Sequence, residues 1–324
     1  MAVMSKNYLF GGQSRRWMPI VYLLPGILLY LVIAIGPSMA TTIYSFTNET
    51  GIRGAQTDFI GLANYSEFTG ISRADGEWTF NSAIARDNLG ATWRTLQFSF
   101  FVTFIQFTLG LIIALILNRA LRGRTIFRTL FFMPVMLGAV VQGLMWKLFL
   151  LPGSGPMAQF LELFGMTGSQ FLAGDPGTAF TWVIIVQIWA NVGITMVIFL
   201  AGMQTIDENL YEAARIDGAG GWALFRDITW PQLTPAINTN FLLNIIGSLQ
   251  AWELFLVLTS YKTGTQVLGY LVFAQGFGQT SGSTSSAFRQ GFASAASIIL
   301  FFMVLIIGLS ANKLVAYRER KFLG

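Results

Sequence analysis

Long apolar segments are the feature that most constrains how this chain of 324 residues can fold. A helix needs about 20 mainly apolar residues to cross a hydrocarbon core roughly 30 Å thick, because each residue adds about 1.5 Å. Several segments meet this length, and only 11% of the residues are charged, against roughly 25% in soluble domains. Continuous apolar runs are not typical of barrel strands, whose polarity alternates. The sequence therefore predicts an all-α polytopic membrane protein in contact with the lipid bilayer.

Six segments are predicted to span the membrane as helices. Their expected bounds are 19–45, 95–117, 128–149, 180–202, 236–259 and 293–315. The parts between and around them are an N-terminal segment 1–18, an outer segment 46–94, a polar loop 203–235 and a tail 316–324. SRRWMP near the start resembles a twin-arginine export signal, but the apolar run after it is longer than a signal core. We expect this run to be kept as the first spanning helix.

Basic residues are concentrated in the segments that we place on one side of the membrane. The N-terminal segment has Lys6, Arg15 and Arg16 without an acid, and the connection between the second and third helices carries only arginines as charged residues. The tail has three bases against Glu319. Cytoplasmic loops carry an excess of Lys and Arg, so both termini are predicted to be cytoplasmic.

Cysteine and histidine are absent from the chain. Thiol nucleophiles, imidazole bases, disulfides and the commonest metal ligands are therefore excluded. We predict no catalytic residue, no metal site and no cofactor bound by this chain. The sequence also lacks the G-x-x-x-x-G-K-[ST] loop that binds ATP phosphates. A membrane-embedded enzyme would depend on carboxylates, nearly all of which lie in loops.

The polar loop 203–235 contains LYEAARIDGAGGW and five acids. Asp207 is a suitable N-cap for a short helix, and Gly218 a suitable residue to end it, because glycine accepts the left-handed conformation of a C-terminal cap. A second short helix is expected over 222–229, stopped by Pro231. The loop is thus predicted to form a bent pair of helices.

Four residues of the first short helix are spaced three and four apart and share one face. They are Leu210, Ala213, Ala214 and Asp217. Two alanines on this face would let a partner's backbone approach closely, and Glu212 could reach Arg215 or a cation on a partner. A charged amphipathic helix is also what a solvated linker would show, so that alternative stays open.

The spacing of Glu212-Ala213-Ala214, Gly218, Ile228 and Pro231 resembles the EAA loop of permease subunits of binding-protein-dependent ABC importers. EAARIDGAGG and ITWP resemble the carbohydrate-importing branch, which includes the maltose and glycerol-phosphate permeases. YLLPGILLY, FIGLANY and LNRALRGRTIFRTLFFMPV occur in the order found in that family. The chain is therefore similar to this family over most of its length.

The resemblance implies a type I ABC importer permease fold, with residues 80–315 as the permease domain, in a bacterial inner membrane. It implies that Glu212 is the polar anchor to an ATPase, that Ala213 and Ala214 form the close-packing surface, and that Gly218 makes the turn. Asp217 lies on the same face. The implied partners are a second homologous permease, two ATPase subunits that bind ATP and Mg, and an extracytoplasmic solute-binding protein. A homodimer of this permease remains open, and no nucleic acid is expected.

Polar side chains in the fourth and fifth predicted helices are candidates for a solute path, because such groups are costly against lipid. They are Gln187, Trp189, Asn191, Asn244, Ser248, Gln250, Trp252 and Glu253. Amides could meet hydroxyls and indole rings could stack on the apolar faces of a sugar. Polar groups also tie helices together, and the sequence does not decide between these roles.

Glu253 is the one acid placed inside a predicted span, where an ion pair with Lys262 or Lys147 is the slightly favoured interpretation. The alternative function is a secondary transporter or channel working alone. Ion-coupled transporters usually carry more carboxylates within the membrane than the single Glu253. A transporter working alone would also not need a docking loop.

Overall fold

The fold is given by a computed structural model, which describes residues 18–322 apart from 53, 75–76, 120–121, 167, 169, 260–261, 263 and 279–287. The described part is helical except for a hairpin of two antiparallel strands, β1 (Ile71–Ala74) and β2 (Glu77–Phe80), and one isolated bridge between Thr47 and Phe59. The expected N-terminal segment 1–18 lies almost entirely outside the described residues.

Four helical stretches are long and apolar enough to cross a membrane. The first is α1 (Met18–Tyr30), a π-helical turn η2 (Leu31–Ile35) and α2 (Gly36–Tyr44); the others are α4 (Ser82–Leu117), α8 (Pro176–Gln204) and α15 (Gln290–Phe322). Helix α4 begins well before the predicted residue 95. Asn81 caps it, because the Asn81 side-chain oxygen accepts hydrogen bonds from the backbone N–H groups of Ala83 and Ile84.

The third and fifth predicted spans are each divided into two helices rather than continuous. Helix α5 (Arg124–Phe132) and the 3₁₀ turn η3 (Met133–Met136) are bent by 102° from α6 (Ala139–Phe149). Helix α12 (Thr234–Leu249) is bent by 49° from α13 (Glu253–Thr259). The chain has six candidate spans if each bent pair crosses the membrane as one.

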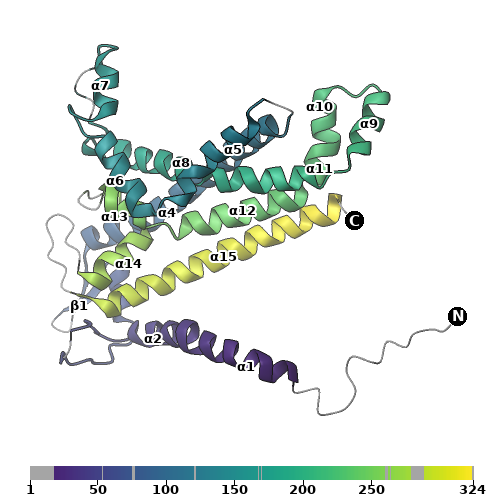
Figure 1. Cartoon of the computed structure of the whole chain (residues 1–324). Coiled ribbons are helices and arrows are strands. Elements are labelled where there is room, and N and C mark those ends of the chain that lie inside the picture. The colour runs from purple at the N-terminus through teal and green to yellow at the C-terminus, as the bar shows by residue number, and fades with distance from the viewer. Residues whose placement is uncertain are drawn as a thin grey trace.

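The long helices α4, α8, α12 and α15 form the body of the molecule (Figure 1). Buried apolar side chains join α4, α8 and α12, among them Phe98, Phe199 and Ile237. In Figure 1, α9 (Glu208–Ile216) and α10 (Gly221–Ala223) lie at one end of the body, with the turn between α4 and α5. Helix α7 (Pro156–Glu162) and strand β1 lie at the opposite end.

The described residues between α2 and α4 form a small cap at that opposite end, whereas residues 82–94 of the expected outer segment belong to α4 (Figure 1). The cap contains α3 (Ala63–Phe68), whose Glu67 forms a 2.5 Å salt bridge with Arg289 before α15. The Arg289 guanidinium also lies 4.6 Å from the centre of the Phe292 ring. Asn64 donates hydrogen bonds to the carbonyl oxygens of Ser45 and Thr47, at 2.9 and 2.8 Å. The cap is therefore attached to both the first and the last spanning helices.

Helix α8 approaches the C-terminal end of α5 very closely at Gly193. A Cβ atom on Gly193 would overlap the Phe131 carbonyl oxygen and lie 2.9 Å from the Phe132 Cα. Both are backbone atoms, so the contact has no flexible side chain that could move away. Only glycine lets the two backbones pack at this distance.

We predict that Gly193→Ala lowers the stability of the detergent-solubilised protein by about 1–3 kcal/mol, the usual cost of overpacking a close contact. Thermal unfolding followed by tryptophan fluorescence measures this change. The control is Gly26→Ala in α1, where a Cβ would have no neighbour within 4 Å. A loss of stability in the control equal to that in Gly193→Ala would contradict the assignment.

Candidate functional site

A polar cavity of about 310 Å³ lies where the two broken helices meet α8. It is lined by Val135, Leu137, Ala139, Gln142, Gln187, Asn191, Gly247, Gln250, Ala251, Trp252, Glu253 and Leu254. Five of the eight predicted path residues are therefore brought together: Gln187, Asn191, Gln250, Trp252 and Glu253. The cavity lies near the middle of α8, far in sequence from both ends of that helix.

The break between η3 and α6 forms one wall of this cavity. Pro134 lacks a backbone N–H, and Leu137 and Gly138 are extended, so the helix cannot continue through them. Gln142 is 6% exposed, and its side-chain amide donates to the carbonyl oxygens of Pro134 and Leu137, at 2.8 and 3.0 Å. The sequence analysis missed Gln142, although the nearby Pro134 and Gly138 signal a break.

The break between α12 and α13 forms the opposite wall. Gln250 is exposed to the cavity, and the Trp252 ring stacks on Phe273 with centroids 4.5 Å apart. Glu253 opens α13 and is exposed. Among the described residues Glu253 has no salt bridge, and Lys262 instead donates a hydrogen bond to the Gly174 carbonyl oxygen. The favoured ion pair with Lys262 is therefore not formed.

The polar stripe on α12 faces neighbouring helices instead of the cavity. The Asn240 amide donates to the Thr195 carbonyl oxygen at 3.2 Å, and the Gln106 amide donates to the Asn244 side-chain oxygen at 2.9 Å. The hydroxyl of Ser248, which is 3% exposed, donates to that of Ser99 at 2.8 Å. Asn244 and Ser248 thus tie α12 to α4 and α8, the packing role that the sequence left open.

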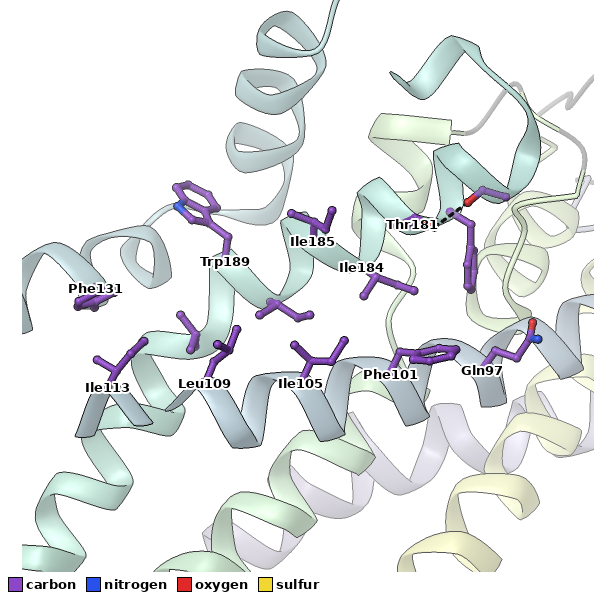
Figure 2. Close-up of a pocket in the computed structure, with 14 residues that line it drawn as sticks. Gln97, Phe101, Ile105, Leu109, Ile113, Phe131, Thr181, Ile184, Ile185 and Trp189 are labelled. Atoms are coloured by element: carbon purple, nitrogen blue, oxygen red, sulfur yellow. Dashed lines mark hydrogen bonds between the residues drawn. The ribbon is translucent and has the colours of Figure 1, made fainter. Parts of the chain in front are cut away.

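Trp189 lies on a different flank of α8 from Gln187 and Asn191. It lines a groove of about 840 Å³ whose other walls are mainly apolar side chains of α4 and α8, with Phe131 of α5 at one end (Figure 2). The Trp189 ring also packs edge-on against Trp146, with centroids 5.5 Å apart. Trp189 does not line the polar cavity, so it is not placed to stack on a solute there.

The polar loop forms a bent helical pair at the end of the body (Figure 1). Helix α9 begins as predicted, because the Asp207 carboxylate accepts a hydrogen bond from the Asn209 N–H at 3.0 Å. The helix ends before Gly218, whose φ of +83° is the left-handed conformation that favours glycine. The cap and the turn are therefore both confirmed.

The bent pair has two arms, α9 before Gly218 and the helical segment after it. The second arm does not stop at Pro231, where the sequence analysis expects it to end. After α10 the chain forms a π-helical turn η5 (Leu224–Thr229), then α11 (Trp230–Gln232), which contains the proline. Proline would clash with the carbonyl four residues before it in a regular helix. The wider π-helical turn before Pro231 changes that register, so the arm stays helical and leads into α12.

Tyr211 attaches the first arm to the second. Its hydroxyl lies 2.9 Å from the Thr229 hydroxyl, and Thr229 is 7% exposed. On the opposite side of α9, Ile216 is 86% exposed, and on α10 Trp222 is 71% exposed. The predicted contact face is accessible, because Leu210, Ala213 and Asp217 are exposed, with Ala214 half-buried. Glu212, beside this face, is exposed as well.

The charges of the two arms are arranged differently. Arg226 donates two hydrogen bonds to the Asp227 carboxylate, at 2.8 and 3.2 Å. These hydrogen bonds lower the pKa of the Asp227 carboxyl, so the pair remains ionised at neutral pH. Glu212 has no ion pair among the described residues. The Glu212 carboxylate is thus available to a cation on another molecule.

Comparison with known proteins settles the family of this chain. Residues 106–324 match the family described as binding-protein-dependent transport system inner membrane component. The chain belongs to this family. It is therefore a permease subunit of an ABC importer and not an enzyme, since ATP is hydrolysed by separate ATPase subunits. The family works with a substrate-binding protein and ATPase subunits, and its members are multi-pass membrane proteins.

Individual relatives cover almost the whole permease. It is 28% identical over 311 residues to the sn-glycerol-3-phosphate transport system permease protein UgpA of Pectobacterium atrosepticum, covering 94% of this chain and 95% of the relative. It is 29% identical over 289 residues to the trehalose/maltose transport system permease protein MalF of Thermococcus litoralis, covering 87% and 88%. A probable ABC transporter permease of Pyrococcus horikoshii is 31% identical over 294 residues, covering 89% and 92%.

Among solved structures, a bacterial ABC transporter involved in the import of the acidic polysaccharide alginate has a similar chain. Its TM-score is 0.76 at 22% identity, covering 94% of this permease and 96% of that chain. The likeness shows that the two chains share the type I importer permease fold.

We predict that Tyr211→Phe loosens α9 without unfolding the permease. It removes one hydrogen bond, which contributes about 0.5–1.5 kcal/mol. Hydrogen–deuterium exchange over residues 208–217 should therefore be faster in the variant. Tyr65→Phe is the matched control, because it removes a 2.8 Å hydroxyl contact with Ser45 in the cap. Equal exchange of α9 in Tyr211→Phe and the unaltered permease would show that this contact does not hold the arm.

Proposed function

We propose that the permease imports a sugar or sugar derivative and that the polar cavity is part of the translocation path. The observation that supports this most directly is the gathering of Gln187, Asn191 and Gln250 around one cavity in the middle of the body. Amides both donate and accept hydrogen bonds, which suits hydroxyl groups. The names of the relatives, which include glycerol-phosphate and trehalose/maltose systems, agree with this substrate class.

The side chains of the cavity suit an uncharged, hydroxylated solute better than an ion. Trp252 is held by its stack on Phe273 and adds an apolar aromatic surface. Glu253 is the one charged residue in the lining. A volume of about 310 Å³ lies at the lower end of the range for small-molecule sites, roughly 300–1,000 Å³. A complete path would be formed with a second, homologous permease.

The loop that contains α9 and α10 is proposed to dock on an ATPase subunit. Glu212 would bind a cation of the ATPase, while Ala213 and Ala214 would allow close packing, and Gly218 would maintain the bend. Exposed Ile216 and Trp222 flank this surface. Two ATPase subunits would bind ATP and Mg, and an extracytoplasmic binding protein would deliver the solute to a complex in the bacterial inner membrane. This arrangement makes both termini cytoplasmic.

Two long helices join the proposed docking loop to the cavity. Helix α8 carries Gln187 and Asn191 and leads into α9, while the second arm leads into α12, which ends beside Gln250. The two helices pack tightly next to the loop, because a Cβ on Gly202 would lie 2.6 Å from the Ala236 Cβ. Movement of the loop would therefore reach the cavity through both helices together.

We predict that Gln187→Ala weakens solute binding by roughly two- to tenfold, the effect of losing one neutral hydrogen bond of about 0.5–1.5 kcal/mol. Calorimetry on the purified importer without its binding protein measures this change, and uptake by proteoliposomes should fall as well. The contrasting variant is Ser248→Ala, since Ser248 packs against Ser99 outside the cavity lining. It should lower thermal stability but leave solute affinity within twofold. Unchanged affinity in Gln187→Ala would reject the cavity as the solute site.

We predict that Glu212→Lys abolishes most ATP hydrolysis stimulated by loaded binding protein, because it places a positive charge against the proposed cation of the ATPase. Co-purification of the ATPase and its stimulated activity in proteoliposomes are the measurements. Glu162→Lys makes the same change on exposed α7 at the opposite end of the molecule and should retain both. Normal ATPase association and transport in Glu212→Lys would contradict the docking role.

A further inference from the structure

Arginines cluster where α4 ends and α5 begins, and we call Arg119, Arg122 and Arg124 the basic rim. The segment 118–132 contains four arginines, and no Asp or Glu. Arg128 is used within the fold, where its guanidinium donates to the Leu117 carbonyl oxygen at 3.2 Å and so caps the end of α4. Arg119, Arg122 and Arg124 are exposed. Three guanidinium groups are therefore presented at one end of the body.

Apolar side chains are exposed directly beside this rim. On α5, Ile126, Phe127 and Leu130 are 65, 48 and 53% exposed. Positions 126 and 130 are four residues apart, and 127 is three from 130, so all three share one face. Helix α5 itself packs against α8. The exposed face would be costly in water, and it begins two residues after Arg124.

The apolar groove that contains Trp189 leads away from the same place. Figure 2 shows Ile113 of α4 and Phe131 of α5 at one end of the groove, and Gln97 and Thr181 at the other. Arg124 precedes Phe131 by seven residues within α5, which corresponds to about 10 Å along that helix, and Arg119 lies two residues beyond the end of α4. Arg124 thus lies about 10 Å along α5 from one end of a long apolar groove, and Arg119 and Arg122 precede it in the chain.

We propose that this rim and groove bind an anionic phospholipid of the cytoplasmic leaflet. The phosphate would lie at Arg119, Arg122 and Arg124, since guanidinium groups donate paired hydrogen bonds to phosphate. An acyl chain would follow the apolar face of α5 into the groove. Charge complementarity favours an anionic over a zwitterionic lipid, and the groove favours a lipid over a free phosphate. The lipid proposal rests on the proposed function at one point: docking of α9 on an ATPase subunit would place this end of the body at the cytoplasmic leaflet.

The test is lipid retention by the intact importer complex. Complexes are equilibrated with equal amounts of phosphatidylglycerol and phosphatidylcholine, and bound lipids are counted by native mass spectrometry. One basic residue near an anionic surface contributes about a fivefold preference, so the triple variant Arg119→Gln, Arg122→Gln, Arg124→Gln should lose at least tenfold in phosphatidylglycerol binding. The triple Arg→Lys variant keeps the charges and should retain most of it. Arg86→Gln, which removes an exposed base near the start of α4 at the opposite end of the body, should change binding less than twofold.

A second measurement tests the groove. Brominated acyl chains quench nearby tryptophans, so brominated phosphatidylglycerol should quench Trp189 more than brominated phosphatidylcholine does. The Trp189→Phe variant isolates that contribution, and the triple Gln variant should abolish the difference between the two lipids. Free phosphate should not compete with phosphatidylglycerol, as it lacks an acyl chain.

The proposal is overturned if the unaltered complex shows no preference for phosphatidylglycerol, as expected if a second permease covers the groove. It is also overturned if the preference survives in the triple Gln variant. Stimulated ATP hydrolysis is measured in the same preparations. Lipid preference without stimulated hydrolysis would support the lipid surface while rejecting the proposed function, so the two failures are distinguishable.

Discussion

The need to satisfy backbone polar groups inside a membrane is the constraint on which this structure depends. Water is absent from the hydrocarbon core, so a broken helix there must find other hydrogen-bond partners for the groups that it frees. Gln142 does this at the break before α6, where its amide binds the Pro134 and Leu137 carbonyl oxygens. The break is therefore a defined element of the fold, and it gives the polar cavity one of its walls.

Polar side chains have two different roles in this body, and their contacts separate them. On α12, the side chains of Asn240, Asn244 and Ser248 are used in bonds to α4 and α8. On α8, Gln187 and Asn191 line the cavity instead. The first group joins α12 to its neighbours, whereas the second lies beside an open space, where the Asn191 amide also donates to the Gln187 carbonyl oxygen at 3.1 Å. The second group is therefore the one that we propose to meet a solute.

The sequence predicts features that depend on local chemistry. The N-cap at Asp207 and the left-handed turn at Gly218 are both found, because each depends on one residue and its neighbours. The break at 250–252 was not predictable in the same way, since it contains no Pro or Gly. The different direction of Trp189 could have been predicted, because at about 100° per residue it lies roughly 200° around α8 from Gln187. Helical spacing alone separates this tryptophan from the amide stripe.

Close packing of small residues explains how a loop at one end could influence a cavity in the middle. Gly202 lets α8 meet α12 at Ala236, next to the loop, and Gly193 lets α8 meet the backbone of α5 farther along. A helix held by such close contacts on two sides cannot bend locally without disturbing them, because the Phe131 backbone and the short Ala236 side chain leave little that can adjust. Displacement of α9 would therefore move α8 as a rigid element, carrying Gln187 and Asn191 with it. The wall at Gln142 belongs to α6, whereas Gln250 directly follows α12, so the cavity would change shape as α8 and α12 moved relative to α6.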